Sequence, residues 1–284
     1  MTTISSGDYE VGVTEAGGGI TFLRLRGVDV LRPAPAQPAV PLDLSCFPLV
    51  PYANRIAHGR FTWEGRQVSI EPNTPGDPSP MHGDGWLSVW SIAQLSADRI
   101  VLEMRHSAGA WPWGYLARQT IAADPGGVSL GLELINQSDG LMPAGLGLHP
   151  YFPGRSEARL TAEVRAVWLT DKDLLPTDLA PPDRFGDWAR GAPLAAAELI
   201  DNCHTGWSGP AEIVLADRDM LVRLTAAPSQ RWLHVYSPPG QDFFAIEPVS
   251  HRPDALNTPN PMGEGVIALP PGAALRAGMR IEAD

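Results

Sequence analysis

The sequence predicts an all-β fold, an antiparallel β-sandwich or barrel, from three observations. Short runs rich in apolar and β-branched residues recur at intervals of roughly 8–12 residues. Glycine and proline, 29 of each among 284 residues, separate these runs and supply turn conformations. No alternation of strands with helices points to a parallel sheet. Because composition is even along the chain and no linker or fixed-period repeat stands out, we expect a single domain over residues 1–284.

The first third of the chain predicts two hairpins and a surface connector. Residues 20–31 alternate apolar and polar side chains and can turn at Gly27 or Asp29. Residues 33–41 are rich in proline, which fixes φ and removes an N–H donor, so we expect an extended surface segment there. Residues 61–70 carry β-branched and aromatic residues around a Glu-Gly pair and predict the second hairpin.

Two irregular segments, both interrupted by prolines, flank the second hairpin. Residues 47–61 place Asn54 and Arg55 next to each other. Residues 73–85 lead to His82. We therefore expect loops, rather than strands, to present these polar side chains.

The middle of the chain predicts four strands, at residues 86–95, 99–106, 115–123 and 128–136. The Asp-Pro-Gly-Gly sequence between the last two predicts a turn, since proline presets φ and glycine accepts a positive φ. A polar turn at residues 136–140 leads into an apolar, glycine-spaced strand over residues 141–148. His149 stands at the mouth of this strand, and Pro150 stops it.

The rest of the chain predicts further strands, at residues 158–170, 211–216, 220–226, 231–237, 243–247, 265–269 and 274–281. Residues 194–200 are the one candidate for a short helix. Residues 201–207, with the sequence DNCHTGW, are expected to form a loop.

Composition limits the function. The net charge of −11 argues against a nucleic-acid partner, because binding to phosphates depends on lysine and arginine. Cys46 and Cys203 are too few for a disulfide framework and, like the seven histidines, lack metal-binding spacing, so we expect a reducing compartment and no metal. The first residues do not read as a signal peptide, and no apolar run approaches the roughly 18–20 residues of a membrane helix. We therefore expect a cytoplasmic protein with no membrane partner.

Two titratable residues stand at strand ends that a proline closes. His149 suits proton transfer because histidine changes charge near neutral pH, although a half-buried structural histidine is the commoner case. Glu247 ends an otherwise apolar strand and is either solvent-facing or functional. Their similar placement would aim both side chains into one cavity.

Asp201 and Trp207 lie at the two ends of the expected 201–207 loop. A carboxylate accepts hydroxyl donors and an indole packs on C–H faces, so the combination suits a polyhydroxylated ligand. An ordinary Asx turn or a helix N-cap would explain Asp201 equally well.

Taken in order and spacing, a set of motifs resembles the aldose 1-epimerase, or galactose mutarotase, family over residues 47–257. The motifs are Asn54-Arg55-Ile56, Gly59-Arg60-Phe61, His82-Gly83, His149-Pro150-Tyr151-Phe152, Asp201, Glu247-Pro248, Ser250, Asp254, Ala255 and Asn257. Each motif alone is weak, whereas the ordered set is fairly specific. The DNC-x-TGW sequence is most similar to members whose substrates are less well defined than those of the galactose enzymes.

The resemblance implies a galactose mutarotase-like supersandwich with an open sugar-binding cleft, and cofactor-free interconversion of the α and β anomers of an aldose. It also implies that Glu247 is the general base for the anomeric hydroxyl and that His149 is the general acid for the ring oxygen. A carboxylate and an imidazole can hold these opposite roles once their surroundings separate them. The substrate-binding residues that the resemblance implies are Asn54, Arg55, His82 and Asp201.

Departures from the family pattern leave alternatives open. His204 stands where similar members have phenylalanine, which would change the surface offered to a substrate, and His234 stands where galactose-type members have glutamine. A hexose-6-phosphate 1-epimerase would share the fold and the pair but needs a basic pocket, to which Arg60 and Arg252 could contribute. A non-catalytic carbohydrate-binding protein would keep Asp201 and the aromatic residues without needing the pair. The sequence does not name the aldose or the oligomeric state.

Overall fold

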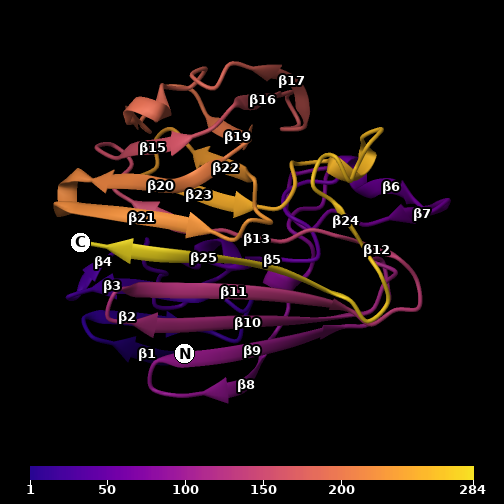
Figure 1. Cartoon of the computed structure of the whole chain (residues 1–284), viewed down its shortest axis with the longest axis horizontal. Coiled ribbons are helices and arrows are strands. Elements are labelled where there is room, and N and C mark those ends of the chain that lie inside the picture. Colours follow the sequence, from indigo (N-terminus) through magenta and orange to yellow (C-terminus); the bar gives the residue numbers. More distant parts are fainter.

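The computed structural model describes residues 1–284 and contains strands and short 3₁₀ turns but no α-helix. Every pairing between neighbouring strands is antiparallel, which confirms the predicted all-β antiparallel sandwich. No helix is long and apolar enough to cross a membrane. Figure 1 shows the long strands lying side by side, with the loops around β6 and β24 gathered at the opposite end from the C-terminus.

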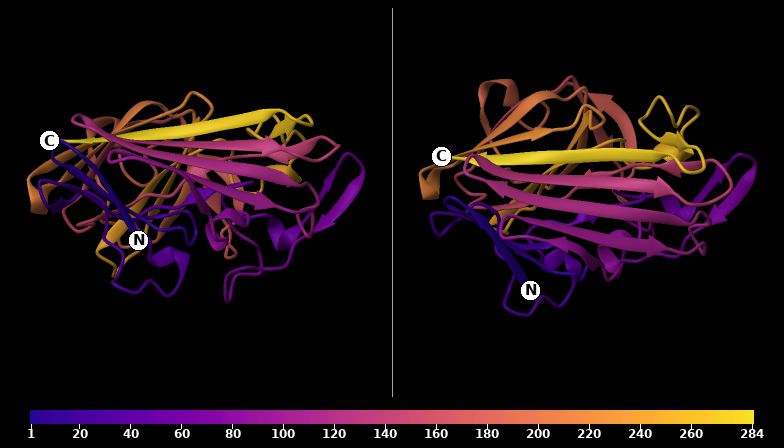
Figure 2. Two further views of the ribbon diagram at one scale, coloured as in Figure 1. Left: turned by 90° about the horizontal axis from the view of Figure 1, so that it is seen from below. Right: turned by 60° about the horizontal axis from the view of Figure 1, so that its bottom comes forward.

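The larger sheet has nine strands. Their order is β18 (Ala192–Pro193), β15 (Arg159–Glu163), β20 (Ser208–Leu215), β21 (Met220–Ala226), β25 (Ala274–Ala283), β11 (Gly127–Asn136), β10 (Tyr115–Asp124), β9 (Arg99–His106) and β8 (Ser91–Leu95). The expected Asp-Pro-Gly-Gly turn joins β10 to β11, where Asp124 pairs with Gly127. Figure 2 shows this sheet as one layer of the molecule, with most of the remaining strands forming the layer behind it.

The second sheet has eight strands and carries the candidate site. Its order is β17 (Pro176–Ala180), β16 (Ala166–Thr170), β19 (Ile200–Thr205), β22 (Trp232–Ser237), β23 (Phe243–Val249), β13 (Gly147–Leu148) and β5 (Pro48–Leu49), with β14 (Tyr151–Pro153) also paired to β23. Smaller sheets complete the fold. One is a four-stranded sheet of β1 (Thr2–Ser6), β2 (Tyr9–Val13), β3 (Ile20–Leu25) and β4 (Val28–Asp29), in that order. The others are the hairpin of β6 (Arg60–Trp63) and β7 (Arg66–Ser69) and the pair of β12 (Met142–Ala144) and β24 (Ile267–Leu269).

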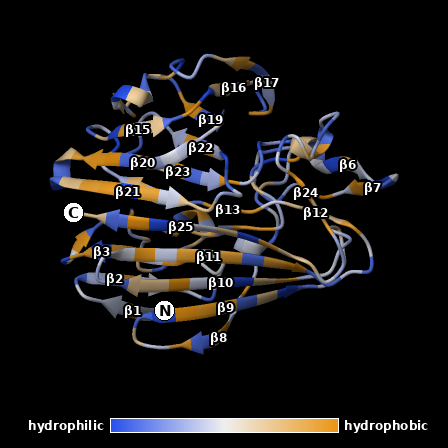
Figure 3. Ribbon diagram, in the orientation of Figure 1, coloured by the Kyte–Doolittle hydropathy of each residue, from blue (hydrophilic) through white to orange (hydrophobic).

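One apolar core lies between the two large sheets. Alternate residues of β11 point into it, and apolar and polar residues alternate along the strands in Figure 3. On β22, Leu233 and Val235 belong to the same core, whereas His234 and Tyr236 between and beyond them do not. The period of two therefore gives the second sheet one apolar face and one face on which polar side chains can gather.

Several predicted elements have different boundaries or a different structure. Residues 158–170 form two strands in different sheets, β15 and β16, instead of one. Residues 141–148 likewise divide into β12 and β13, because the chain passes from one sheet to another around Gly145. Residues 86–95 begin with a 3₁₀ turn, Gly85–Leu87, before β8. The N-terminal strands β1 and β2, and β17, were not predicted.

Three further predictions are wrong because tertiary contacts override local preference. Residues 194–200 form no helix: they lead from β18 into β19, and the N–H of the buried Leu194 donates to the carbonyl of Ala158. Residues 201–207 are largely the strand β19, and the polar residues that suggested a loop alternate between the two faces of the sheet. Glu247 does not end its strand, because β23 continues through Pro248 to Val249.

Candidate active site

A hollow of about 220 Å³ opens on the polar face of the second sheet. Its lining contains all six residues that the sequence singled out for catalysis or binding, together with residues that it did not. The lining residues are Leu42, Asn54, Arg55, Met81, His82, His149, Tyr151, Leu174, Leu199, Asp201, His234, Tyr236 and Glu247. The six predicted residues come from five separate parts of the chain and meet at one place, as the prediction of a common cavity requires.

Strand register brings three of these side chains together. β22 lies between β19 and β23, and His234 is opposite both Cys203 of β19 and Glu247 of β23. Asp201 lies opposite Tyr236 in the same way. Because residues directly opposite in adjacent strands share a face, Asp201, His234, Tyr236 and Glu247 all present their side chains to the hollow, and Cys203 is buried on the same face.

His149 and Glu247 are in contact inside the hollow. The distance between His149 Nε2 and Glu247 Oε1 is 3.3 Å, and the two side chains are 6% and 2% exposed. Burial lowers the pKa of His149 well below its usual value and raises the pKa of Glu247 to about 8. Burial therefore disfavours the pair of imidazolium and carboxylate, and favours the proton on the carboxyl group of Glu247.

Aromatic packing fixes the ring of His149. It stacks on Phe47 with ring centroids 4.6 Å apart and lies against Tyr151 at 4.5 Å. The backbone N–H of His149, which lies between β13 and β14, donates to the carbonyl oxygen of Phe47. Tyr151, the aromatic residue after Pro150, forms a wall of the hollow, whereas Phe152 belongs to the core.

Asn54 and Arg55 form the second side of the hollow. The Asn54 Oδ1 accepts the N–H of Arg55 at 2.8 Å, which suits the left-handed conformation of Asn54 at φ 59°. The Arg55 Nε donates to Asp77 at 2.8 Å, and its Nη1 lies 3.6 Å from Asp201 Oδ2. The guanidinium group is thus held beside the carboxylate that the sequence assigned to substrate binding.

His82 reaches the hollow from a constrained loop. Its Nδ1 accepts the N–H of Asn54 at 3.1 Å, so Nε2 carries the proton and can donate to a ligand. Burial lowers the pKa of His82 to about 3, which keeps the ring neutral. The adjacent Gly83 has φ 70°, and a Cβ there would lie 2.1 Å from the carbonyl oxygen of Val50.

Asp84 anchors this loop to the larger sheet. Its two carboxylate oxygens bond to the ring of His106 on β9 and to the hydroxyl of Tyr115 on β10. His106 lies on a strand with only 14% of its side chain exposed. Asp84 does not line the hollow, so it acts on the site through the loop that carries His82.

His234 lies in the hollow, where the sequence noted only a departure from the family pattern. Its Nε2 is 2.6 Å from Asp201 Oδ1 and 3.5 Å from Asn54 Nδ2. Burial alone would lower the pKa of His234, but the negative charges of Glu247 and Asp201 outweigh it and raise the pKa to about 10. The sequence analysis did not identify Tyr236. The one signal for it was its position two residues after His234, which places both side chains on the same face of β22.

His204 does not face a substrate, contrary to the expectation that it alters the surface offered to one. It lies on the apolar side of β19, is 0% exposed, and packs against Trp188 with ring centroids 4.4 Å apart. Neither ring nitrogen has a hydrogen-bond partner, and burial lowers its pKa to about 3. We call this buried space against Trp188 an aromatic slot; because it offers the ring no hydrogen-bond partner, phenylalanine would suit the position.

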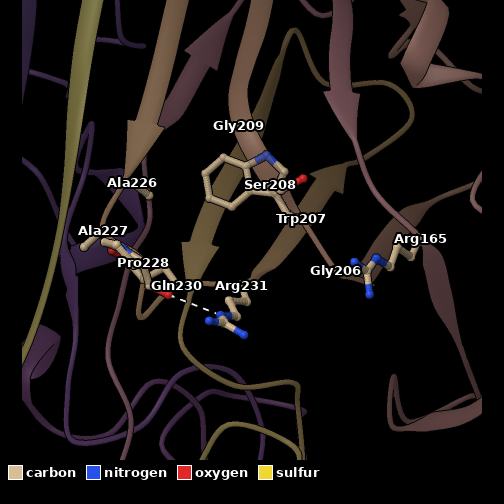
Figure 4. A pocket seen from close by; sticks show the side chains of 10 residues that line it. All are labelled: Arg165, Gly206, Trp207, Ser208, Gly209, Ala226, Ala227, Pro228, Gln230 and Arg231. Atoms are coloured by element: carbon tan, nitrogen blue, oxygen red, sulfur yellow. Dashed lines mark hydrogen bonds between the residues drawn. The ribbon is translucent and has the colours of Figure 1, made fainter.

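Trp207 faces a different hollow from Asp201, so the two do not bracket one ligand. Figure 4 shows this second hollow, about 430 Å³, between Arg165, Trp207 and Arg231. Its lining contains no histidine or carboxylate and therefore no acid/base pair. The aromatic side chains at the candidate site are Tyr151 and Tyr236 instead.

Other titratable residues that the sequence noted support or lie outside the site. His251 is buried behind it, where its Nε2 accepts the N–H of Ala53. Arg60 is exposed in a separate hollow, and Arg252 stacks on Trp168 and pairs with Glu264. The structure brings no group of three or more His, Cys, Asp or Glu residues into an arrangement that could hold a metal ion.

Comparison with known proteins agrees with this geometry. A model of the aldose 1-epimerase family matches residues 1–282. The uncharacterized protein YphB of Escherichia coli K12 is 32% identical over 291 residues, covering 99% of this chain and 98% of that protein. A crystal structure of a candidate aldose 1-epimerase from Escherichia coli K12 superposes with a TM-score of 0.91 at 31% identity, over 99% and 98% of the two chains. A galactose mutarotase-like protein from Clostridium acetobutylicum shares the fold, with a TM-score of 0.86 at 17% identity over 99% and 94%.

Proposed function

This chain belongs to the aldose 1-epimerase family, and from that premise we propose that it interconverts the α and β anomers of a free aldose by acid/base ring opening and closure. The contact between His149 and Glu247, inside a hollow that also presents Asp201, Arg55 and His82, carries the proposal. A general acid and a general base within reach of the same anomeric centre are what this reaction needs.

The proposed cycle moves one proton in each direction. The Glu247 carboxylate takes the proton from the anomeric hydroxyl while the His149 imidazolium gives its proton to the ring oxygen. The bond between the anomeric carbon and the ring oxygen breaks, and the anomeric carbon becomes an aldehyde carbonyl. After the aldehyde rotates, protonated Glu247 returns a proton to the carbonyl oxygen and neutral His149 takes one from the hydroxyl as the ring closes.

The 3.3 Å contact lets a proton pass directly between the two groups, from the buried carboxyl group to the imidazole, which forms the reactive pair. One proton is shared by the two groups throughout the cycle, and ring opening converts imidazolium and carboxylate into imidazole and carboxyl. The second state is the one that burial favours, so desolvation assists ring opening. Among the other polar groups of the lining, Asp201, Arg55 and His82 would hold the hydroxyls of the sugar during rotation.

The lining favours a free aldose over a sugar 6-phosphate. Arg55 is its only arginine, and it is already engaged with Asp77 and lies near Asp201. Arg60 and Arg252, which could have formed a phosphate clamp, lie outside the hollow. A non-catalytic sugar-binding protein would have no use for a buried acid/base pair whose ionisation opposes folding.

The test is anomer exchange measured by NMR on a panel of free and 6-phosphorylated aldoses. We expect rapid exchange on a free aldose, lowered by about 10²–10⁴ in Glu247→Gln and in His149→Asn, because each removes one positioned acid or base. His58→Asn is the matched control, since His58 lies outside the hollow and asparagine tolerates its positive φ of 50°. Sugar binding without exchange in the wild type would contradict the proposal.

A further inference from the structure

The carboxylates around the hollow outnumber the permanent cations. Asp77, Asp201 and Glu247 lie in or beside it, and Arg55 is the only arginine or lysine that contacts any of them. His82 cannot supply a further cation while its Nδ1 accepts the Asn54 N–H. Even with the His149 imidazolium of the proposed cycle beside Glu247, the three carboxylates face only two positive charges, so a third is needed if all three are to be ionised together.

His234 is placed to supply that charge. It stands on the central strand, β22, between Asp201 on one neighbour and Glu247 on the other. The 2.6 Å contact with Asp201 is typical of a charge-assisted hydrogen bond. The groups that face the ring are Asp201, Cys203, Glu247, Asn54, Arg55, His82, His149 and Tyr236.

We propose that His234 is a positioning residue for the epimerase reaction: as an imidazolium between Asp201 and Glu247, it holds the Asp201 carboxylate in place and stabilises the ionised, basic form of Glu247 against the effect of burial. The role rests on the proposed function, in which Glu247 is the base. His234 takes up and releases no proton during the cycle. Glutamine, which stands here in the galactose-type pattern, could donate the same hydrogen bond to Asp201 but would bring no charge to Glu247.

Because glutamine would replace the hydrogen bond of His234 but not its charge, the proposal predicts the direction in which the pKa of Glu247 changes. An opposite charge within about 4–6 Å typically lowers the pKa of a carboxyl group by 1–3 units. Removing the imidazolium should therefore raise the pKa of Glu247 above its present value near 8. The base would then need a higher pH to ionise, and the acidic limb of the kcat/KM profile would move to higher pH.

The experiment compares wild type with His234→Gln by NMR and by kinetics. In wild type with labelled histidine, we expect the ¹⁵N shifts of the His234 ring to show an imidazolium at pH 7.5. In the variant, we expect the pKa of the Glu247 carboxyl, followed by ¹³C NMR, to rise by about one pH unit or more. The acidic limb of the kcat/KM profile should move by the same amount, which lowers kcat/KM about tenfold at a fixed pH below the limb.

His204→Phe is the matched control, because His204 is also a buried histidine but lies on the opposite face of β19, outside the hollow. It should leave the Glu247 titration and the pH profile unchanged. A neutral His234 ring in wild type, or the same Glu247 titration with and without His234, would overturn the inference. These NMR readouts need no turnover, so they decide the inference even if wild type exchanges no sugar and the proposed function fails.

Should His234→Gln not fold, Asp201→Asn provides a second test by NMR alone. Loss of the carboxylate partner should lower the pKa of the His234 ring, whose charge it helps to hold. An unchanged ring titration in that variant would also count against the ion pair.

Discussion

The buried histidines of this chain differ in how their ring nitrogens are satisfied, and only His204 lacks a partner at both nitrogens. His234 contacts a carboxylate, and His82 and His251 each accept a backbone N–H. His204 has no partner at either nitrogen although it is completely buried. A buried polar group without a partner costs stability, so His204 is a cost to the fold that no feature of the candidate site offsets.

We therefore predict that His204→Phe stabilises the protein by about 1 kcal/mol, since it removes two unpaired ring nitrogens from an aromatic slot against Trp188. Urea unfolding at pH 7.5 measures the change, and anomer exchange should stay at the wild-type rate. A clear loss of stability would mean that the larger ring does not fit against Trp188, which would contradict the slot described above.

At the scale of single elements, strand register explains what the sequence could and could not reveal. The motifs identified His149, Glu247, Asp201 and the loop residues because proton transfer and hydroxyl binding need particular residue types. The opposite orientations of His204 and Asp201 were hidden, because a polar strand lining a hollow has the composition of a loop and only pairing with β22 fixes its alternation.

The loop that carries His82 yields the element-scale prediction. Gly83→Ala places a methyl group 2.1 Å from the Val50 carbonyl, in a backbone conformation with φ 70°, so the loop must shift and move His82. We expect a loss of about 1–3 kcal/mol in stability and a raised KM for the sugar. Gly76→Ala in the same segment is the control, since φ is 83° but no atom lies within 4 Å of the added carbon. Equal effects on KM in the two variants would contradict the positioning of His82 by Gly83.

For the molecule as a whole, the antiparallel architecture was predictable and the division into sheets was not. Turn residues at regular spacing identify short strands, but they do not show which strands pair. Residues 158–170 read as one strand because nothing local marks the point where the chain leaves β15 in one sheet for β16 in the other. Burial of the N-terminal strands β1 and β2 likewise depends on contacts with β9 and β10, far away in the sequence.

The candidate site should also leave a pH signature in the stability of the whole protein. Burial raises the pKa of folded Glu247 to about 8, above the value of an exposed glutamate, so its contribution to stability is complete below about pH 4.3 and is lost as pH rises towards 8. Glu247→Gln cannot ionise and escapes this loss. The free energy of unfolding of the variant, measured with urea, should match wild type at pH 5 to within about 1 kcal/mol and exceed it by a margin that grows up to pH 8, at up to about 1.4 kcal/mol per pH unit. A margin that is the same at both pH values would mean that Glu247 ionises as readily in the folded protein as in the unfolded chain, and the proposed base would then lack the buried, raised pKa on which its pairing with His149 depends.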